Sequence, residues 1–264
     1  MSDFRMFFGA ASGSDHIALR AFREPNVMCS YATKENIPKY DPARLFVDSG
    51  AYSVVPGEGD YQTGVEEYLD HVEEVDADLF ALRDYPCEEG VLDDLGRSVE
   101  EHQNRTTDAH IRVLDAFEAR DMDATPVAVL QGRDADDYLD HLDRMRDMGL
   151  VRATGYVGIG TLCGRDDVEE IGEIIRRVGE ATDARLHAFG VKVTTFRETD
   201  ALDYLSSADS LAYSSRTRRR ERSERWTNKA GHYSRMRAQI DDLVGEGRVE
   251  ERSQRTLDAV GGAD

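Results

Sequence analysis

The stretch that decides the fold class is residues 126–159, PVAVLQGRDADDYLDHLDRMRDMGLVRATGYVGI. It opens with a short apolar run, continues through an amphipathic segment at 135–148 that Asp134 can cap, and closes with a second apolar run. Both runs are apolar at nearly every position, which is typical of strands buried on both faces of a parallel sheet. The stretch therefore predicts two parallel strands joined by a helix.

The same alternation extends along the chain in both directions. Apolar runs occupy 4–8, 27–31, 45–48, 79–82, 126–130, 156–159, 186–189 and 210–213. Helix-patterned segments occupy 65–75, 96–120, 135–148, 168–182 and 200–206, with Asp166 and Thr199 as further candidate caps. Eight such alternations predict an α/β fold, a (β/α)8 TIM-like barrel, over residues 1–215. The connection between the second and third runs is short for a full helix.

Residues 216–264, helix-patterned around 232–244, are expected to form a short basic appendage packed on the barrel or extending from it.

The charge of the chain is strongly negative and built almost without lysine. Its 264 residues hold 33 Lys+Arg against 53 Asp+Glu, a net charge of −20, and only Lys34, Lys39, Lys192 and Lys229 are lysines. Strong acidity with few lysines indicates a surface adapted to concentrated salt, although an acidic protein of low-salt origin has the same signature. We expect a soluble cytoplasmic protein of a halophilic archaeon or its virus, because neither a membrane span nor a signal peptide is recognisable.

The cysteines do not point to a metal or to disulfides. Cys29, Cys87 and Cys163 are too far apart in sequence for a zinc pair or a disulfide framework, and we expect three buried thiols.

One short segment is strongly basic. Residues 216–237, here called the arginine island, carry nine cations against Glu221 and Glu224. Such a patch in an acidic chain predicts binding to a polyanion, with Trp226 and Tyr233 available for stacking. The alternative is a solvated helix face that compensates nearby acids. The arginines expected to bind nucleic acid are Arg216, Arg218, Arg219, Arg220, Arg222 and Arg225.

Polar residues gather where the predicted strands end. Active sites of (β/α)8 barrels lie at the carboxyl ends of the strands, and the residues there are Asp48, Asp84, Gln131, Asp209 and the glycines of GYVGIG. Each alone would suit a cap or a turn. Together they predict a site in which paired carboxylates transfer a sugar, because hydrolase, metal and phosphate-loop motifs are missing. Tyr52 and Phe189 would suit a flat base.

Six segments at these strand ends resemble a known family. DSGAY (48–52), RDYP (83–86), VLQGR (129–133), GYVGIGTLCG (155–164), HAFGVK (187–192) and DSLAYSSR (209–216) are similar, in order and spacing, to the barrel motifs of tRNA-guanine transglycosylases. They look still more like the DpdA-type relatives that insert 7-deazaguanines into DNA. The resemblance covers residues 4–216 and implies replacement of guanine in DNA by a base such as 7-cyano-7-deazaguanine. The reaction would pass through a covalent aspartyl–sugar intermediate and need no cofactor.

The resemblance also assigns roles to individual residues. Asp209 would be the nucleophile and Asp48 the general acid/base. Asp84 would accept from the guanine N–H and amino groups, while Gln131 and the backbone around Gly160 would read its carbonyl. The remaining substrate contacts would come from Ser49, Tyr52, Phe189 and Gly190, with Arg216 on a phosphate.

The chain departs from the tRNA enzymes after the barrel. Their zinc site of three cysteines and a histidine has no counterpart, because no cysteine follows Asp209 and the only histidine there is His232. The missing zinc subdomain favours DNA as the partner, with tRNA as the alternative, and partner proteins that open the duplex as a further expectation. An inactive nucleic-acid-binding barrel in a modification complex is a third reading, against which stands the presence of both Asp48 and Asp209.

Overall fold

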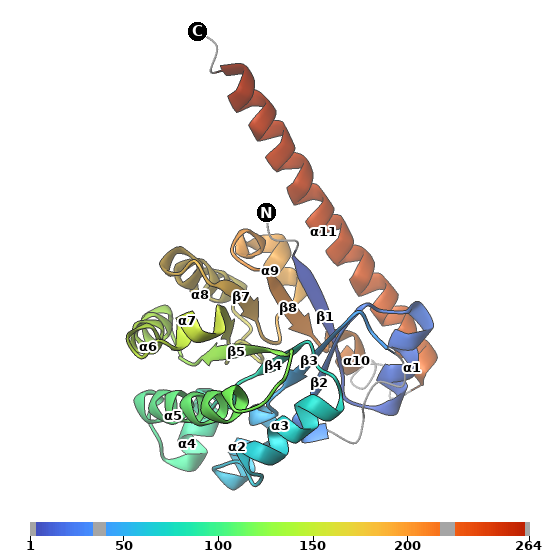
Figure 1. The fold of residues 1–264 in the computed structure, drawn as a ribbon. Coiled ribbons are helices and arrows are strands. Elements are labelled where there is room, and N and C mark those ends of the chain that lie inside the picture. Colours follow the sequence, from blue (N-terminus) through green and yellow to red (C-terminus); the bar gives the residue numbers. More distant parts are fainter. Residues whose placement is uncertain (1–3, 34–40, 217–224, 262–264) are drawn as a thin grey trace.

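The barrel is closed and wholly parallel. The computed structural model describes residues 4–33, 41–216 and 225–261, and within them eight strands form one barrel in sequence order (Figure 1). Every strand pairs in parallel with the next, and β8 returns to β1 with Asp209 opposite Phe7. The predicted α/β (β/α)8 barrel is therefore confirmed.

The strands lie inside a ring of helices. The strands are β1 Arg5–Ala10, β2 Asn26–Ser30, β3 Arg44–Asp48, β4 Leu79–Ala81, β5 Thr125–Leu130, β6 Tyr156–Ile159, β7 Arg185–Ala188 and β8 Ser207–Ser210. The helices and short turns are α1 Gly13–Phe22, η1 Tyr31–Thr33, α2 Ala51–Glu58, α3 Val65–Glu74, α4 Glu89–Leu95, α5 Val99–Glu118, α6 Ala135–Asp147, α7 Leu150–Thr154, α8 Val168–Ala181, α9 Val193–Glu198, η2 Ala201–Asp203, α10 Ala212–Arg216 and α11 Trp226–Gly261.

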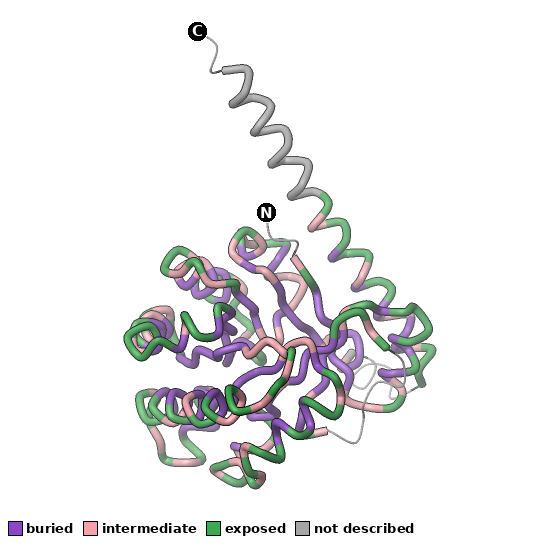
Figure 2. Tube along the Cα trace, in the orientation of Figure 1, coloured by how far each residue is buried: buried purple, intermediate pink, exposed green. Residues whose placement is uncertain are grey.

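The barrel wall separates two apolar layers. Side chains alternate along a strand, so Phe7 points into the barrel while Phe8 points out toward the helices. Inside, Phe7 meets Phe46 edge to face at 5.5 Å between ring centroids, and Val127 and Tyr156 belong to the same cluster. The buried strands run through the middle of the molecule in Figure 2, and exposed helix surfaces surround them.

Several predicted elements and caps need correction. The last strand is β8, Ser207–Ser210, whereas residues 212–213 of the predicted run belong to α10, where the Tyr213 hydroxyl donates to the Gly9 carbonyl at 2.8 Å. The strand escaped detection because its residues, SADS, are small or polar. Residues 200–206 form only the single turn η2. Asp167, not Asp166, is the N-cap of α8, and Thr199 is the C-cap of α9 rather than the N-cap of the following turn.

The predicted helix at 96–120 is two helices with a break before the second. Gly96 ends α4 in the left-handed conformation, with φ 61°. Ser98 then starts α5 with a capping box, in which its side chain accepts from the Glu101 amide and the Glu101 carboxylate accepts from the Ser98 amide.

Helix α11 packs on the barrel where β8 meets β1. Lys229, only 1% exposed, forms an ion pair with the buried Asp15 of α1 at 2.7 Å and also donates to Ser12 at 2.9 Å. Further along, the Tyr233 hydroxyl donates to the buried Glu24. Figure 1 shows α11 continuing past the barrel on the side where β1 begins. The division into residues 1–215 and 216–264 remains a prediction.

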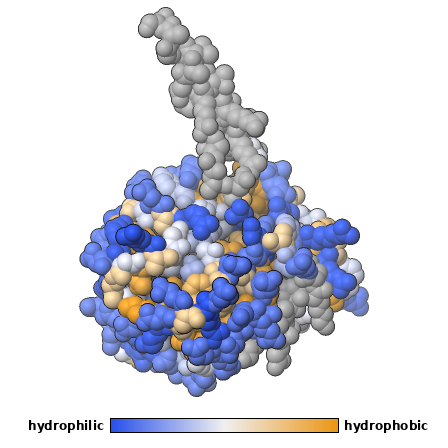
Figure 3. Space-filling view, viewed as in Figure 1, coloured by the Kyte–Doolittle hydropathy of each residue, from blue (hydrophilic) through white to orange (hydrophobic). Residues whose placement is uncertain are grey.

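Hydrophilic side chains cover most of the face seen in Figure 3, and apolar ones appear between them. Among the described residues, no helix is long and apolar enough to cross a membrane.

Candidate active site

One cavity collects the residues from the strand ends. It has a volume of about 260 Å³ and opens at the carboxyl ends of the strands. Eight of the predicted site residues line it, namely Asp48, Tyr52, Asp84, Gln131, Gly160, Phe189, Gly190 and Asp209. A larger cavity of about 580 Å³ lies at the opposite end of the barrel, among residues that precede β3, β4 and β5. We place the site in the smaller cavity, because the predicted polar set is there.

Asp209 is held by two donors that leave one oxygen for chemistry. It lies in β8 and is 9% exposed. Its Oδ1 accepts from the Gly190 amide at 2.8 Å and contacts His187 Nε2 at 3.4 Å. The Gly190 amide reaches the carboxylate because Gly190 adopts φ 70°, and a Cβ there would stand 2.8 Å from the Cys163 Cβ. Both contacts fall on Oδ1, so Oδ2 is the oxygen available for attack.

Asp48 ends β3 and has an unusually high proton affinity. Its carboxylate accepts from the Gly50 amide at 3.2 Å and from the Ser30 hydroxyl. Burial, and to a lesser degree the charge of Asp209, raise the pKa of Asp48 to about 6, against these hydrogen bonds. A carboxyl group with such a pKa can both give and take a proton near neutral pH.

Asp84 and Gln131 form the polar floor of the cavity. Asp84 accepts from the Ser49 hydroxyl at 2.8 Å and from Gln131 Nε2, and the backbone amide of Asp84 donates to the Tyr61 hydroxyl. Burial and the charge of Asp48 raise the pKa of Asp84 to about 7. Ser49 itself is absent from the cavity lining and holds Asp84 from behind. Its predicted direct contact with substrate is therefore replaced by a supporting one.

Two glycines make room for this arrangement. A Cβ on Gly158 would stand 2.3 Å from the Phe189 ring, and one on Gly160 would stand 2.4 Å from Gln131 Nε2. The backbone groups of Gly160 are already engaged, since its amide donates to Leu130 and its carbonyl accepts from Tyr138. Gly160 thus contributes space rather than a hydrogen bond. Tyr52 of α2 also lines the cavity and is 58% exposed.

Sequence reasoning missed a polar chain inside the barrel. His187 Nδ1 lies 2.7 Å from Ser207 Oγ, and the Tyr156 hydroxyl contacts the same Ser207 oxygen. The rings of Phe46 and Phe189 flank His187, with centroids 4.9 and 4.4 Å away. Burial lowers the pKa of His187. Its position in β7, two residues before the predicted site residue Phe189, was the available signal, because residues at that spacing in an extended chain share a face.

Sequence reasoning also missed a fourth carboxyl group at the cavity. Glu88, just before α4, lines it together with Thr161 and Cys163. Cys163 is exposed, whereas Cys29 and Cys87 are buried as expected, so the prediction of three buried thiols is wrong for Cys163. Within the described ranges, no group of three His, Cys, Asp or Glu side chains could hold a metal ion.

Part of the arginine island lies outside the residues that the structure describes. Arg218, Arg219, Arg220 and Arg222, and the side chain of Arg216, lie outside the described residues, while Arg225 is exposed immediately before α11. The described parts on either side of residues 217–224 lie near the mouth of the barrel, whereas Arg237, at the far end of the segment, contacts Glu24 just before β2. Helix α10 follows the carboxyl end of β8, and Lys229 reaches Ser12 just beyond the end of β1.

Comparison with known proteins identifies the family. No curated protein matches the chain. The sequence model of the family described as DpdA, DeoxyPurine in DNA protein A, matches residues 33–232. This span starts before β3 and ends within α11, and so includes every cavity-lining residue except Gly9, Ala10, Ala11, Met28 and Ser30. The chain therefore belongs to the DpdA family, within the tRNA-guanine transglycosylase superfamily.

Proposed function

We propose that this protein exchanges guanine in DNA for a 7-deazaguanine, such as 7-cyano-7-deazaguanine, through a covalent bond between Asp209 and the deoxyribose. The observation that carries the proposal is that one cavity brings the carboxyl groups of Asp209 and Asp48 together with the Asp84–Gln131 pair. The first two groups can perform the sugar chemistry, and the pair can recognise the base. The family name, DeoxyPurine in DNA, supports DNA as the polymer.

The exchange has two displacement steps at the anomeric carbon C1′. In the first, Asp209 Oδ2 attacks C1′, the bond from C1′ to N9 of guanine breaks, and protonated Asp48 gives its proton to the leaving base. In the second, Asp48 takes the proton from N9–H of the incoming base, N9 attacks C1′, and the bond to Asp209 breaks. Two inversions retain the configuration of the sugar. A pKa near 6 suits Asp48 for both proton transfers.

The polar floor matches the edge that guanine and 7-deazaguanine share. Asp84 would accept from the ring N1–H and the exocyclic amino group. Gln131 uses one Nε2 hydrogen on Asp84, and its second hydrogen would donate to the base carbonyl O6. Adenine lacks the N1–H and carries a donor where guanine has O6, so it would leave these groups unpaired.

Aromatic side chains would hold the two faces of the base. Tyr52 stands exposed at one side of the opening, and Phe189 packs over Gly158 on the other. A stacked base gains on the order of 1–3 kcal/mol. The base must first leave the helix, which costs on the order of a few kcal/mol, so single-stranded or opened DNA would be the better substrate. Partner proteins that open the duplex would act at this step.

The arginine island would hold the phosphates while this happens. Helix α10 and Lys229, on either side of residues 217–224, lie at the end of the barrel where the cavity opens. A chain with a net charge of −20 otherwise repels DNA, so a local positive patch is needed for binding. The salt adaptation inferred from the composition remains part of this proposal, because concentrated salt weakens phosphate contacts and requires arginines that also donate paired hydrogen bonds.

Covalent trapping tests the proposal directly. Incubated with single-stranded DNA that contains guanine and without free base, the wild type should give a protein–DNA adduct that survives denaturing electrophoresis. Asp209→Asn should give none, because an amide is not an anionic nucleophile. The matched control is Asp183→Asn, which changes an exposed residue just before β7. An adduct with Asp209→Asn would disprove the assignment, and an adduct with tRNA alone would favour the tRNA alternative.

A further inference from the structure

Glu88 is a carboxyl group in the cavity that the proposed exchange does not use. It lines the cavity beside Thr161, and its Oε2 lies 3.3 Å from Thr161 Oγ1. Building on the proposed function, we propose that Glu88 selects the substituent at position 7 of the incoming base by donating a hydrogen bond to it. The substituent class that fits is one that only accepts, such as a nitrile.

The order of groups along the polar floor supports this position. Asp84 accepts from Gln131 Nε2, Gln131 Oε1 contacts the Thr161 hydroxyl, and Glu88 lies on the far side of Thr161. Around the edge of the base, the N1–H and amino groups are followed by O6, and O6 is followed by position 7. If Asp84 faces the N1–H and amino groups and Gln131 faces O6, then Glu88 faces position 7.

A proton count through the network makes Glu88 the donor. Gln131 turns its amide nitrogen to Asp84, so its Oε1 must accept the single proton of the Thr161 hydroxyl. Thr161 Oγ1 also accepts from the Cys87 amide at 2.9 Å. Thr161 thus has no second proton for Glu88, so the 3.3 Å contact is a hydrogen bond only if Glu88 is protonated and donates. When a base binds, this single proton would turn from Thr161, which keeps the Cys87 amide as a donor, to the substituent at position 7. Burial independently raises the pKa of Glu88.

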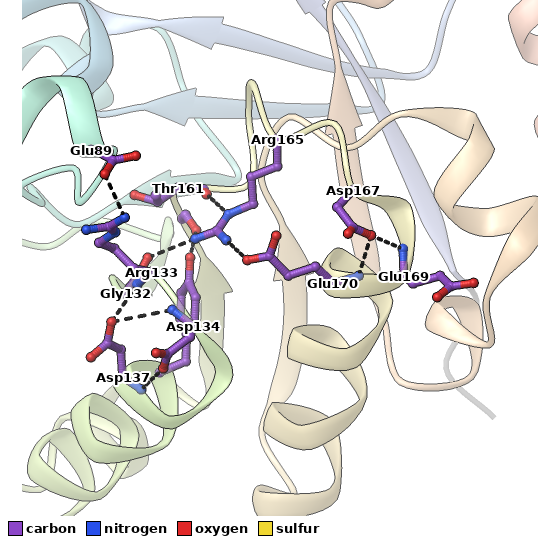
Figure 4. Close-up of polar contacts among 12 residues, drawn as sticks. Glu89, Gly132, Arg133, Asp134, Asp137, Thr161, Arg165, Asp167, Glu169 and Glu170 are labelled. Carbon is purple, nitrogen blue, oxygen red and sulfur yellow. Dashed lines mark hydrogen bonds and ion pairs between the residues drawn. The ribbon is translucent and has the colours of Figure 1, made fainter.

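The loop that carries Thr161 is held in a strained conformation. Thr161 has φ 52°, which is unfavourable for a β-branched residue. Figure 4 shows how Arg165 fixes the loop: its Nε donates to the Thr161 carbonyl at 2.7 Å, and its other nitrogens reach the Gly132 carbonyl and Glu170. Such strain, maintained by three contacts of one arginine, is expected where a side chain must face a ligand.

The charges around Glu88 decide the sign of the pH effect. The charge of Glu88 contributes to the raised pKa values of Asp84, Tyr52 and Cys163, and Arg165 is the cation that opposes proton binding at Glu88. At low pH the protonated group donates to a nitrile nitrogen. As the pH rises through its pKa, Glu88 becomes a carboxylate, which repels that nitrogen but would attract an aminomethyl cation.

The test compares three incoming bases: 7-cyano-, 7-aminomethyl- and unsubstituted 7-deazaguanine. The readout is the ratio of kcat/KM for the nitrile to that for the unsubstituted base, over a pH series that begins at the ordinary glutamate pKa of 4.5 and ends at about pH 8.5. In the wild type the ratio should exceed one and fall with rising pH. Glu88→Gln should keep it without pH dependence, because the amide N–H donates at every pH, while Glu88→Leu should lower it about 3- to 10-fold. Glu89→Gln, at the exposed neighbouring residue, is the matched control and should behave as wild type.

The ratio separates the two proposals. An unchanged ratio in Glu88→Leu, or a wild-type ratio that does not fall as the pH rises, would overturn the role of Glu88. A wild type that exchanges no base, labelled guanine included, would instead refute the proposed function on which this role rests. A variant that folds poorly loses rate with both bases, so its ratio still reports selectivity.

Discussion

His187 Nε2 lies 3.4 Å from Oδ1 of Asp209, and this contact determines which atom donates in each hydrogen bond that continues from His187 through Ser207. An ionised carboxylate only accepts, so Nε2 must carry the hydrogen. Burial keeps the ring neutral by lowering the pKa of His187, so Nδ1 must accept, and the donor is the Ser207 hydroxyl at 2.7 Å. Ser207 in turn accepts from Tyr156. The chain fixes one tautomer, the one that orients Asp209.

Ser207→Ala should therefore impair catalysis, although Ser207 does not line the cavity. Without the Ser207 donor, His187 can carry its proton on Nδ1 and turn a lone pair toward Asp209. We expect kcat to fall about 3- to 10-fold with the KM for free base unchanged, on the scale of one hydrogen bond. Nitrogen-15 NMR of the histidine rings should show His187 shifting from the Nε2–H tautomer to a mixture.

The matched control is Ser206→Ala, one residue earlier and half-buried. A normal NMR spectrum of His187 in Ser207→Ala would contradict the proton order, even if the rate fell, because a loss of packing alone does not change the tautomer.

The barrel could be predicted from sequence because its strands are local apolar runs. The side-chain contacts between strands could not be predicted in this way. Asp48, Asp84 and Gln131 were identifiable because each lies at the end of such a run or within two residues after it. The link from His187 to Asp209 spans two strands and depends on their register in the closed sheet. The role of Glu88 could not be predicted from a local sequence pattern either, because it depends on a contact with Thr161, which lies far along the chain.

Tyr52 provides a test of base stacking. It is 58% exposed and lines the cavity, so Tyr52→Ala removes ring area without disturbing the core. The loss of one stacking face should raise the KM for free base about 5- to 100-fold, in line with roughly 1–3 kcal/mol per stacked base. Tyr52→Phe keeps the ring and should stay near wild type. Equal KM values for Tyr52→Ala and Tyr52→Phe, measured with labelled guanine, would exclude stacking by this residue.

Asp48→Asn should stabilise the fold while it abolishes turnover. The folded-state pKa of Asp48, about 6, exceeds the ordinary 3.8, so the folded protein binds this proton more tightly than the unfolded chain. The free energy of unfolding of the wild type therefore falls as the pH rises from about 4 through about 6. Asparagine does not ionise, so the variant escapes this loss and the repulsion from Asp209.

Thermal unfolding measured at two pH values checks this expectation. The Tm of Asp48→Asn should exceed that of the wild type at pH 8 by several degrees, and the excess should shrink toward zero at pH 4.5. The loss of the Asp48 charge also lowers the raised pKa of Asp84 in the variant, which adds to the excess at pH 8. Asp183→Asn, at an exposed site, should show no such pH-dependent excess. A Tm gain of the same size at both pH values would mean that packing, not ionisation, separates the variant from the wild type.

The arginine island should account for much of the salt dependence of DNA binding. Each phosphate contact releases counterions, with a slope of about 0.9 per contact on a plot of log K against log salt for duplex and about 0.7 for single strands. Replacing Arg218, Arg219 and Arg220 together by alanine should flatten that slope by about 2–3 units and weaken binding to all sequences alike.

The same three positions changed to lysine should keep most of the slope without full exchange activity, because lysine cannot donate paired hydrogen bonds to phosphate. The control removes Arg146, Arg176 and Arg177, which lie on the outer helices α6 and α8. Fluorescence anisotropy across a salt series decides the matter: equal slopes for the wild type and the triple alanine variant would make the island a solvated surface that compensates nearby acids.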